Sequence, residues 1–186
     1  HREGSMKRAA IAVVLLVVLG ACHAGDGQTS SDASALTGEL WVYLEDAWQR
    51  PPPQSGLIGF VPARVVRFDA DGTMSLISCA LLRTERETFI SPGDGLAFYF
   101  GKWHAAKDGF VVDYVKTSET IHASSTGLPF ERKLSATVVL GGGGGLVFDG
   151  TRFERKDAPS MESYNEFRDA QRREHAGEID QFLNEH

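Results

Sequence analysis

The sequence predicts a mainly β protein: an antiparallel meander, closed as a small barrel or folded as a sandwich, with one C-terminal amphipathic α-helix packed on it. Apolar residues cluster in about eight to ten short runs separated by turn residues, which is typical of strands. The turns are short and local, and local connections favour antiparallel neighbours. No helix-length segments alternate with the strands, so a parallel α/β fold is disfavoured.

The first half of the predicted sheet alternates short apolar runs with turn residues. Its strands are expected at residues 39–48, 63–68, 73–82 and 88–90. The prolines at 51–53 end the first strand, because proline lacks a backbone donor and has a fixed φ. The second and third strands form a hairpin in which Gly72 supplies a positive φ.

The second half of the sheet is predicted from the same signals. Its strands are expected at residues 96–104, 110–116, 131–140, 146–148 and 151–155. Asp149 and Gly150 are a residue pair typical of a tight hairpin turn. The five glycines at 141–145 lack the lysine and the helix start of a phosphate-binding loop. They predict a long flexible hairpin tip, which would serve as a contact loop.

The period of the apolar residues changes to that of a helix over residues 160–184. One stripe contains Tyr164, Phe167, Gln171, His175, Ile179, Phe182 and Leu183. Ser163 and Glu166 fit a capping box. Gly177 weakens a helix by about 1 kcal/mol relative to alanine, so we expect the last two turns to fray. The stripe is expected to pack on the sheet or to close one end of a barrel.

The N-terminal residues have the organisation of an export signal. Residues 1–5 precede Met6 and are interpreted as a remnant of expression cloning. Lys7 and Arg8 form a positive region, and an unbroken apolar run (AAIAVVLLVVL) follows them. The apolar run is shorter than the roughly 18–20 residues that span a bilayer. Residues 6–21 are therefore predicted to be a cleaved signal peptide rather than a transmembrane helix.

Residues 19–22 (LGAC) resemble the lipobox of bacterial lipoproteins. This resemblance covers the leader alone, and it implies cleavage before Cys22 and attachment of fatty acyl chains to that residue. His23, rather than aspartate, follows the cysteine, which by the sorting pattern of Gram-negative lipoproteins implies an outer-membrane anchor facing the periplasm. Two or more acyl chains give durable anchoring. Residues 22–37 are predicted to be a flexible tether, and residues 38–186 a single domain.

Composition and motifs exclude several kinds of site. A net charge of −6 disfavours nucleic-acid binding, which needs a basic surface. The histidines lack zinc-ligand spacing, and no nucleophile-elbow sequence is present, so neither a metal, a cofactor nor a catalytic residue is predicted. Asp69 and Asp71 are interpreted as residues of a β-turn rather than of a calcium loop. Cys79 lies in an apolar run and is expected to be buried and inert.

Aromatic residues are in excess on two predicted strands. Alternation places Phe98 and Phe100 on one face, with Tyr99 and Trp103 on the other. The first strand likewise opposes its aliphatic residues to Trp41 and Tyr43. Either both faces are buried, with the C-terminal helix over the outer one, or an aromatic patch binds a ligand or a partner. The candidate binding residues are Trp41, Tyr43, Tyr99, Trp103 and His104.

Three functions from different classes are compatible with these observations. The favoured hypothesis is a non-catalytic protein-binding module in the cell envelope, either an assembly component or an inhibitor or immunity-type partner. The alternative is a lipocalin-like carrier of a small apolar ligand, since a barrel of about eight strands can hold one small molecule. Residues 101–103 (GKW) match the Gly-x-Trp of lipocalins but do not open the first strand, so that family is not assigned. The third hypothesis is an envelope hydrolase with dispersed carboxylates.

Overall fold

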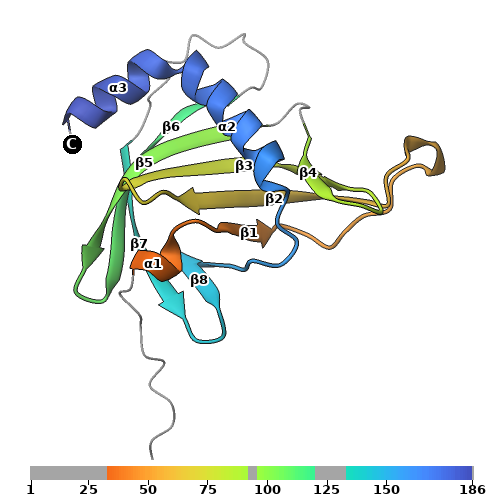
Figure 1. Cartoon of the computed structure of the whole chain (residues 1–186), viewed down its shortest axis with the longest axis horizontal. Coiled ribbons are helices and arrows are strands. Elements are labelled where there is room, and N and C mark those ends of the chain that lie inside the picture. Colours follow the sequence, from red (N-terminus) through yellow and green to blue (C-terminus); the bar gives the residue numbers. More distant parts are fainter. Residues whose placement is uncertain (1–32, 92–95, 120–132, 186) are drawn as a thin grey trace, which may run out of the picture.

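The structure is a computed structural model that describes residues 33–91, 96–119 and 133–185 (Figure 1). The predicted signal peptide, Cys22 and most of the predicted tether lie outside these residues. The described part of the chain forms nine strands: β1 (Leu40–Leu44), β2 (Gly59–Phe68), β3 (Thr73–Arg83), β4 (Thr88–Ile90), β5 (Ala97–Ala106), β6 (Gly109–Glu119), β7 (Lys133–Gly141), β8 (Gly145–Phe148) and β9 (Thr151–Phe153).

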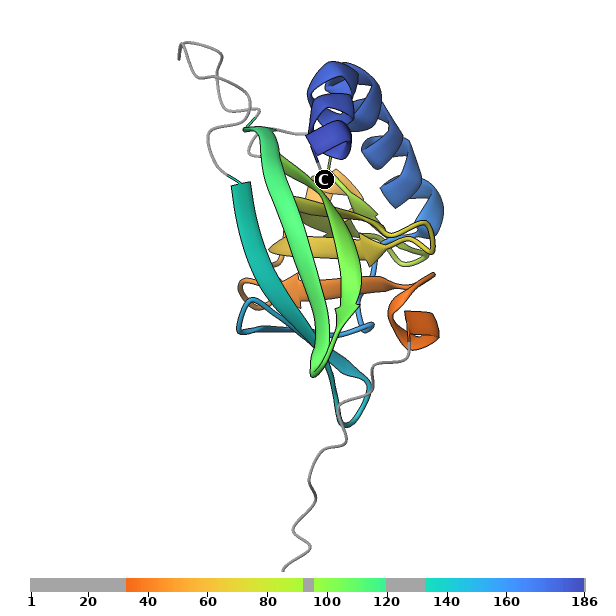
Figure 2. The ribbon, with the colours of Figure 1, turned by 90° about the vertical axis from the view of Figure 1, so that its left-hand side faces the viewer.

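All nine strands belong to one antiparallel sheet, which confirms the predicted fold class. The strand order is β1-β2-β3-β5-β6-β7-β8-β9, and β4 pairs with β3 beside this path. Val42 and Glu154 then join the first strand to the end of the last, through backbone hydrogen bonds of 2.7 and 2.8 Å. The sheet therefore curls into a nearly closed barrel rather than a sandwich (Figure 2).

Turn chemistry explains where the strands reverse. Gly72 has a φ of +83° in the β2–β3 hairpin, and Asp71 accepts hydrogen bonds from the Thr73 amide (2.9 Å) and hydroxyl (2.6 Å). Asp149 and Gly150 both have positive φ values, of 48° and 74°, as a two-residue hairpin turn requires. These two turns agree with the sequence prediction.

The expectation of a long flexible tip at the five glycines is wrong. Gly141 pairs with Gly145, so the two outer glycines belong to strands β7 and β8 and the turn contains residues 142–144. A Cβ atom on Gly145 would lie 2.9 Å from the guanidinium carbon of Arg152 on β9. The absence of a side chain at position 145 therefore leaves room for the Arg152 guanidinium. A glycine-rich composition alone does not reveal this packing role.

The helices are α1 (Ala33–Leu36), the short 3₁₀ helix η1 (Pro53–Ser55), α2 (Met161–Glu174) and α3 (Ala176–Glu185). The predicted single helix over residues 160–184 is thus two helices, separated at His175. Ser160 caps α2, because its hydroxyl accepts a hydrogen bond from the Ser163 amide (3.2 Å). The predicted capping box at Ser163 is wrong. The Ser163 hydroxyl instead accepts from the Ile90 amide (3.0 Å) and ties α2 to β4.

Helices α2 and α3 cover the outer face of the barrel (Figures 1 and 2). Tyr164, Ile179 and Phe182 from the predicted stripe are buried among outward residues of the sheet, such as Phe98 and Phe100. The Tyr164 hydroxyl donates to the Ser75 carbonyl (2.8 Å) and accepts from the Ser75 hydroxyl (2.9 Å), a fully buried pairing. The interpretation that the C-terminal helical segment covers one face of a doubly apolar sheet is therefore confirmed.

The inner face of the barrel holds a second apolar cluster. Its buried members come from α1 and all strands except β4 and β5: Leu36, Trp41, Val66, Phe68, Met74, Leu76, Phe110, Val112, Tyr114, Ala136, Val138, Leu140, Leu146, Phe148 and Phe153. Tyr99 and Trp103 of β5 are half-buried against them. Because side chains alternate along a strand, β1, β2, β3 and β6 contribute buried residues to both clusters.

Candidate functional site

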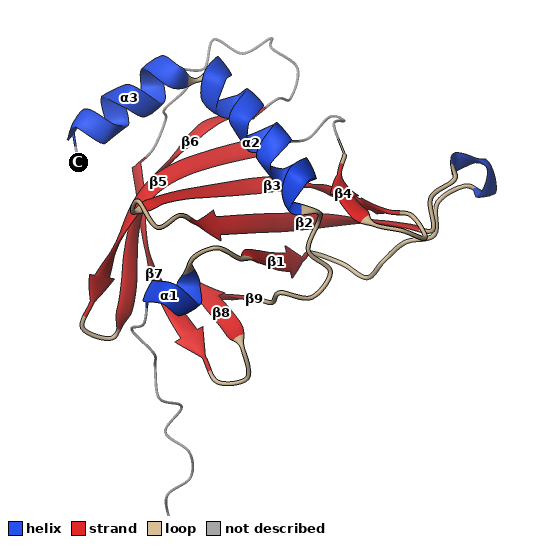
Figure 3. Cartoon of the chain, viewed as in Figure 1, coloured by secondary structure: helices blue, strands red, loops and turns tan. Residues whose placement is uncertain are grey.

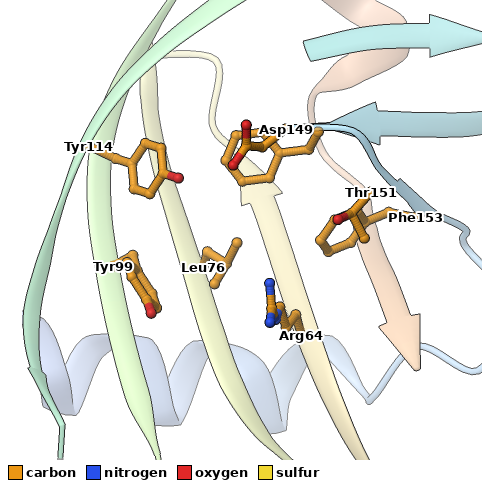
Figure 4. A pocket seen from close by; sticks show the side chains of 8 residues that line it. Arg64, Leu76, Tyr99, Tyr114, Asp149, Thr151 and Phe153 are labelled. Atoms are coloured by element: carbon orange, nitrogen blue, oxygen red, sulfur yellow. The ribbon is translucent and has the colours of Figure 1, made fainter. Parts of the chain in front are cut away.

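A pocket of about 230 Å³ lies within the barrel, and we call it the barrel pocket (Figure 4). Strands β2, β3, β5 and β6 provide one wall, and the β8–β9 hairpin provides the other. The lining residues are Arg64, Leu76, Tyr99, Tyr114, Phe148, Asp149, Thr151 and Phe153. This volume is below the roughly 300–1,000 Å³ of sites for drug-sized ligands, so a smaller molecule fits it.

Aromatic rings form a continuous wall of the barrel pocket. The ring centres of Tyr99 and Tyr114 are 6.1 Å apart, and those of Tyr114 and Phe148 are 5.6 Å apart. Phe153 continues the series at 6.1 Å from Phe148. Such tilted and edge-to-face pairs are favourable arrangements, and together they offer ring faces to a flat or apolar ligand.

Two opposite charges stand at the border of this aromatic wall. Arg64 is on β2, with 47% of its side chain exposed, and its Nε donates to Glu45 Oε1 at 3.0 Å. Asp149 is exposed in the β8–β9 turn, on the far side of the pocket from Arg64 (Figure 4). A second positive group, Lys116 Nζ, lies 6.0 Å from the centre of the Tyr99 ring.

The Tyr114 hydroxyl experiences both charges. Burial raises the pKa of Tyr114 above its ordinary value, and the carboxylate of Asp149 and the Tyr99 hydroxyl raise it further. The Arg64 guanidinium acts in the opposite direction and lowers that pKa. Tyr114 therefore remains a neutral hydrogen-bond donor and acceptor throughout the physiological pH range.

Buried and half-buried aromatic rings occupy another part of the barrel interior. We call the cluster of Trp41, Phe68, Trp103 and Phe110 the packed half. Trp41 is 1% exposed and donates through Nε1 to the Leu36 carbonyl at 3.2 Å. Trp103 donates through Nε1 to the Asp69 carbonyl at 3.0 Å, and its ring lies edge-on to Phe68 and Phe110. Each of these two indole N–H groups thus has a partner within the protein.

The predicted binding residues separate into four environments. Tyr99 lines the barrel pocket, whereas Trp41 and Trp103 belong to the packed half. Tyr43 contacts Phe153, with ring centres 5.9 Å apart. His104 is exposed and is the strand neighbour of Trp103, so it points away from the barrel interior. Four of the five residues therefore face the interior, but one of them lines the barrel pocket.

Sequence reasoning missed Arg64, Tyr114 and Asp149. Arg64 lies at an inward position of β2, between Pro62 and Val66 on the same face, and this polar residue in an apolar register is the signal that could have identified it. For Asp149, the sequence predicts a position in a tight turn and nothing further. Its position opposite Arg64 depends on pairing between strands that are distant in sequence.

Tyr43 also borders a second cleft, of about 310 Å³, at the seam of the barrel. The cleft lies where β1 and β9 diverge from the bridge between Val42 and Glu154, and it is lined by Val42, Tyr43, Leu44, Arg152, Glu154, Lys156 and Asp157. Its charged residues are of both signs. This cleft has fewer aromatic side chains than the barrel pocket.

Cys79 is buried, as predicted, with 5% of its surface exposed. Burial raises the pKa of its thiol to about 12, and the negative charge of Glu45 adds to this shift. Cys79 is therefore a protonated, inert thiol at neutral pH.

Two searches concern the described residues alone. In residues 33–91, 96–119 and 133–185, no three or more histidine, cysteine, aspartate or glutamate side chains are grouped so that they could hold a metal ion. No helix within these ranges is both long enough and apolar enough to cross a bilayer. Comparison of the chain with protein-family models, with curated proteins and with solved structures finds no match.

Proposed function

We propose that this chain is a non-catalytic, lipid-anchored protein of the bacterial cell envelope that binds a small, partly apolar ligand in the barrel pocket. The observation that carries the proposal is an aromatic-walled hollow of about 230 Å³ inside the barrel, with polar and charged residues at its border. Polar groups at the border of an apolar pocket are typical of small-molecule sites, because they orient the ligand.

The apolar surface favours a small ligand over a protein partner. Within the described residues, the large apolar side chains that are exposed are Ile58 (53%) and Met161 (37%). Met161 also contacts Arg67, with its Sδ 3.4 Å from the guanidinium. Stable protein interfaces depend on clustered aromatic and apolar anchors, and two separated side chains are a weak basis for one.

The ligand proposal is tested by blocking the barrel pocket. Thr151→Trp places an indole at the pocket wall, and Arg152→Trp places the same group one residue further along β9, on the other face. We expect naphthylamine, an uncharged fluorophore at neutral pH, to bind the natural protein and Arg152→Trp equally, and to bind Thr151→Trp at least tenfold more weakly. Equal binding to all three proteins, or none to the natural protein, would contradict the proposal.

The anchor is proposed from the lipobox resemblance at residues 19–22. Cells fed a labelled fatty acid should label the natural protein but not Cys22→Ser. Fractionation should place the labelled protein in the outer membrane, and recovery of an unlabelled, buffer-soluble mature protein would contradict the anchor.

A protein-binding module is the second candidate, and one observation favours it. Residues 45–58 form an arm that projects from the barrel and includes η1 (Figure 3). Trp48 fixes the base of this arm: it packs on Gly59 and lies under the Arg83 guanidinium, 3.9 Å from the ring centre. Ile58 is then left exposed on an ordered element. Crosslinking in intact envelopes should capture a protein that Ile58→Glu loses if this candidate is correct.

A further inference from the structure

We infer that the ligand of the barrel pocket is a small dipolar molecule, with an aromatic or apolar body, an anionic group directed to Arg64 and a cationic group directed to Asp149. This inference rests on the proposed ligand-binding function and adds the chemical class of the ligand. Three features of the pocket support it: an incompletely paired cation, an anion without an ion-pair partner among the described residues, and an aromatic wall beside both.

The cation is Arg64. Among the described residues, its ion-pair contact runs from Nε to Glu45 Oε1 at 3.0 Å, which leaves the two terminal NH₂ groups able to donate to another acceptor. A guanidinium binds a carboxylate best through two parallel hydrogen bonds, and one lateral contact does not use that capacity. Arg64 can therefore receive a ligand carboxylate while Glu45 holds the side chain in place.

The anion is Asp149. The structure shows neither an ion pair nor a side-chain hydrogen bond between its carboxylate and any residue of the described ranges. Its backbone is held firmly, since the Asp149 amide donates to the Thr137 carbonyl (3.2 Å) and the following Gly150 completes the turn. A fixed turn thus presents a solvent-exposed carboxylate at the border of the barrel pocket.

The two charges lie at opposite ends of the barrel pocket (Figure 4). Both act on the buried Tyr114 hydroxyl, in opposite directions, which places them within electrostatic reach of the same ring. A ligand with one charge would satisfy one border of the pocket and leave an unfavourable interaction at the other. A ligand with separated charges of both signs satisfies both, while its body stacks on Tyr99, Tyr114 and Phe148.

Glu45 limits the affinity, because it competes with the anionic group of the ligand for Arg64. Glu45→Gln should therefore increase the affinity for anionic and dipolar ligands, whereas Arg64→Gln should decrease it. Two substitutions that break the same ion pair thus have opposite expected effects. A purely structural role of that ion pair would give effects of the same sign.

The experiment uses four probes built on one ring and measured by calorimetric titration of the purified protein. They are para-(aminomethyl)benzoate (dipolar), para-toluate (anionic), para-methylbenzylammonium (cationic) and para-methylbenzyl alcohol (neutral). We expect the dipolar probe to bind most tightly, and the probes with one charge to bind about fivefold more weakly, the scale of a solvent-exposed ion pair.

Two substitutions test which residue binds which charged group of the ligand. Arg64→Gln should weaken the dipolar and anionic probes and spare the cationic one, whereas Asp149→Asn should weaken the dipolar and cationic probes and spare the anionic one. Asparagine tolerates the positive φ of position 149, so the turn is retained. Arg152→Gln is the matched control: this arginine also pairs with a glutamate, Glu154, at 3.4 Å, but it lies outside the barrel pocket, so no probe should be affected.

The possible results separate the two proposals. Equal affinity for the four probes, lost in Thr151→Trp, would overturn the dipolar ligand class and leave the ligand-binding function standing. Preference for a singly charged probe over the dipolar one would also overturn the class. Absence of binding by every probe, naphthylamine included, would overturn both proposals.

Discussion

The two halves of the barrel interior share strands β2, β5 and β6 but differ in how their polar atoms are satisfied. In the packed half, the indole N–H groups of Trp41 and Trp103 donate to backbone carbonyls of the protein. In the barrel pocket, the Asp149 carboxylate has no ion-pair partner in the described residues, and Arg64 has one. We therefore expect the packed half to contribute more to stability, whereas the barrel pocket retains polar groups that can bind a ligand.

Phe148 marks the boundary between the two halves. Its ring contacts Phe68 of the packed half edge-on at 6.3 Å, and Tyr114 of the barrel pocket at 5.6 Å. Strand β8 ends at Phe148, where the hairpin turn begins. The barrel pocket lies between this end of the hairpin and Tyr99. A single aromatic residue thus supports the core on one side and forms the wall of a hollow on the other.

Truncation of a large side chain in each half should give the largest difference in the free energy of unfolding. Trp41→Ala removes a fully buried ring and is expected to lower the free energy of unfolding by about 3–5 kcal/mol. Tyr99→Ala, in the half-exposed wall of the pocket, is expected to cost about 1 kcal/mol, since its ring is solvated on one side. Urea unfolding of both variants measures the difference. Equal losses would show that the two halves contribute alike.

Removal of one side-chain hydroxyl or N–H group from each half also compares how much the two halves contribute to stability. Trp103→Phe keeps a ring in the packed half but removes one of two hydrogen bonds to the Asp69 carbonyl, which still accepts from the Gly72 amide (3.1 Å), so we expect a loss of about 1 kcal/mol. Tyr99→Phe removes a hydroxyl that has no hydrogen-bond partner within residues 33–91, 96–119 and 133–185, and should change stability by less than about 0.5 kcal/mol. Thermal unfolding followed by near-UV circular dichroism compares the two. A larger effect at Tyr99 would contradict the proposed division.

Acid should weaken the turn that borders the packed half. The hydrogen bond from the Thr73 hydroxyl lowers the pKa of Asp71 below its ordinary value of 3.8. A lowered folded-state pKa gives stability that is present above the unfolded-state pKa and is lost as pH falls through the folded-state pKa. Asp71→Asn should therefore flatten the pH dependence of the unfolding midpoint below about pH 4. An unchanged acid profile would show that Asp71 contributes nothing to it.

The smallest expected effect concerns the pKa of Tyr114. Because the Asp149 carboxylate raises that pKa and the Arg64 guanidinium lowers it, Asp149→Asn should lower it and Arg64→Gln should raise it. Ultraviolet absorbance during alkaline titration, with Tyr114→Phe as the reference, measures both shifts. Shifts of the same sign in the two variants would show that the two charges do not act on this ring as proposed.

Sequence periodicity by itself determined the local structure of this protein. The strands, the tight turns at Gly72 and Gly150, and the helical stripe of Tyr164, Ile179 and Phe182 were all predictable. Each depends on residues that are near one another in the chain, because turn residues set the local φ and alternation assigns each side chain to a face. The alternation at Phe98, Tyr99 and Phe100 correctly assigned neighbours to opposite faces of the sheet.

The tertiary structure decided what lies across from each face. The bridge between Val42 and Glu154, which makes the sheet a barrel, joins residues from opposite ends of the sheet. The break at His175 depends on how two helical segments pack on that curved surface. The meeting of Arg64, Tyr114 and Asp149 likewise requires pairing along the sheet from β2 to β8. Periodicity reports the direction in which a side chain points, but its partners depend on contacts between distant parts of the chain, which local patterns do not encode.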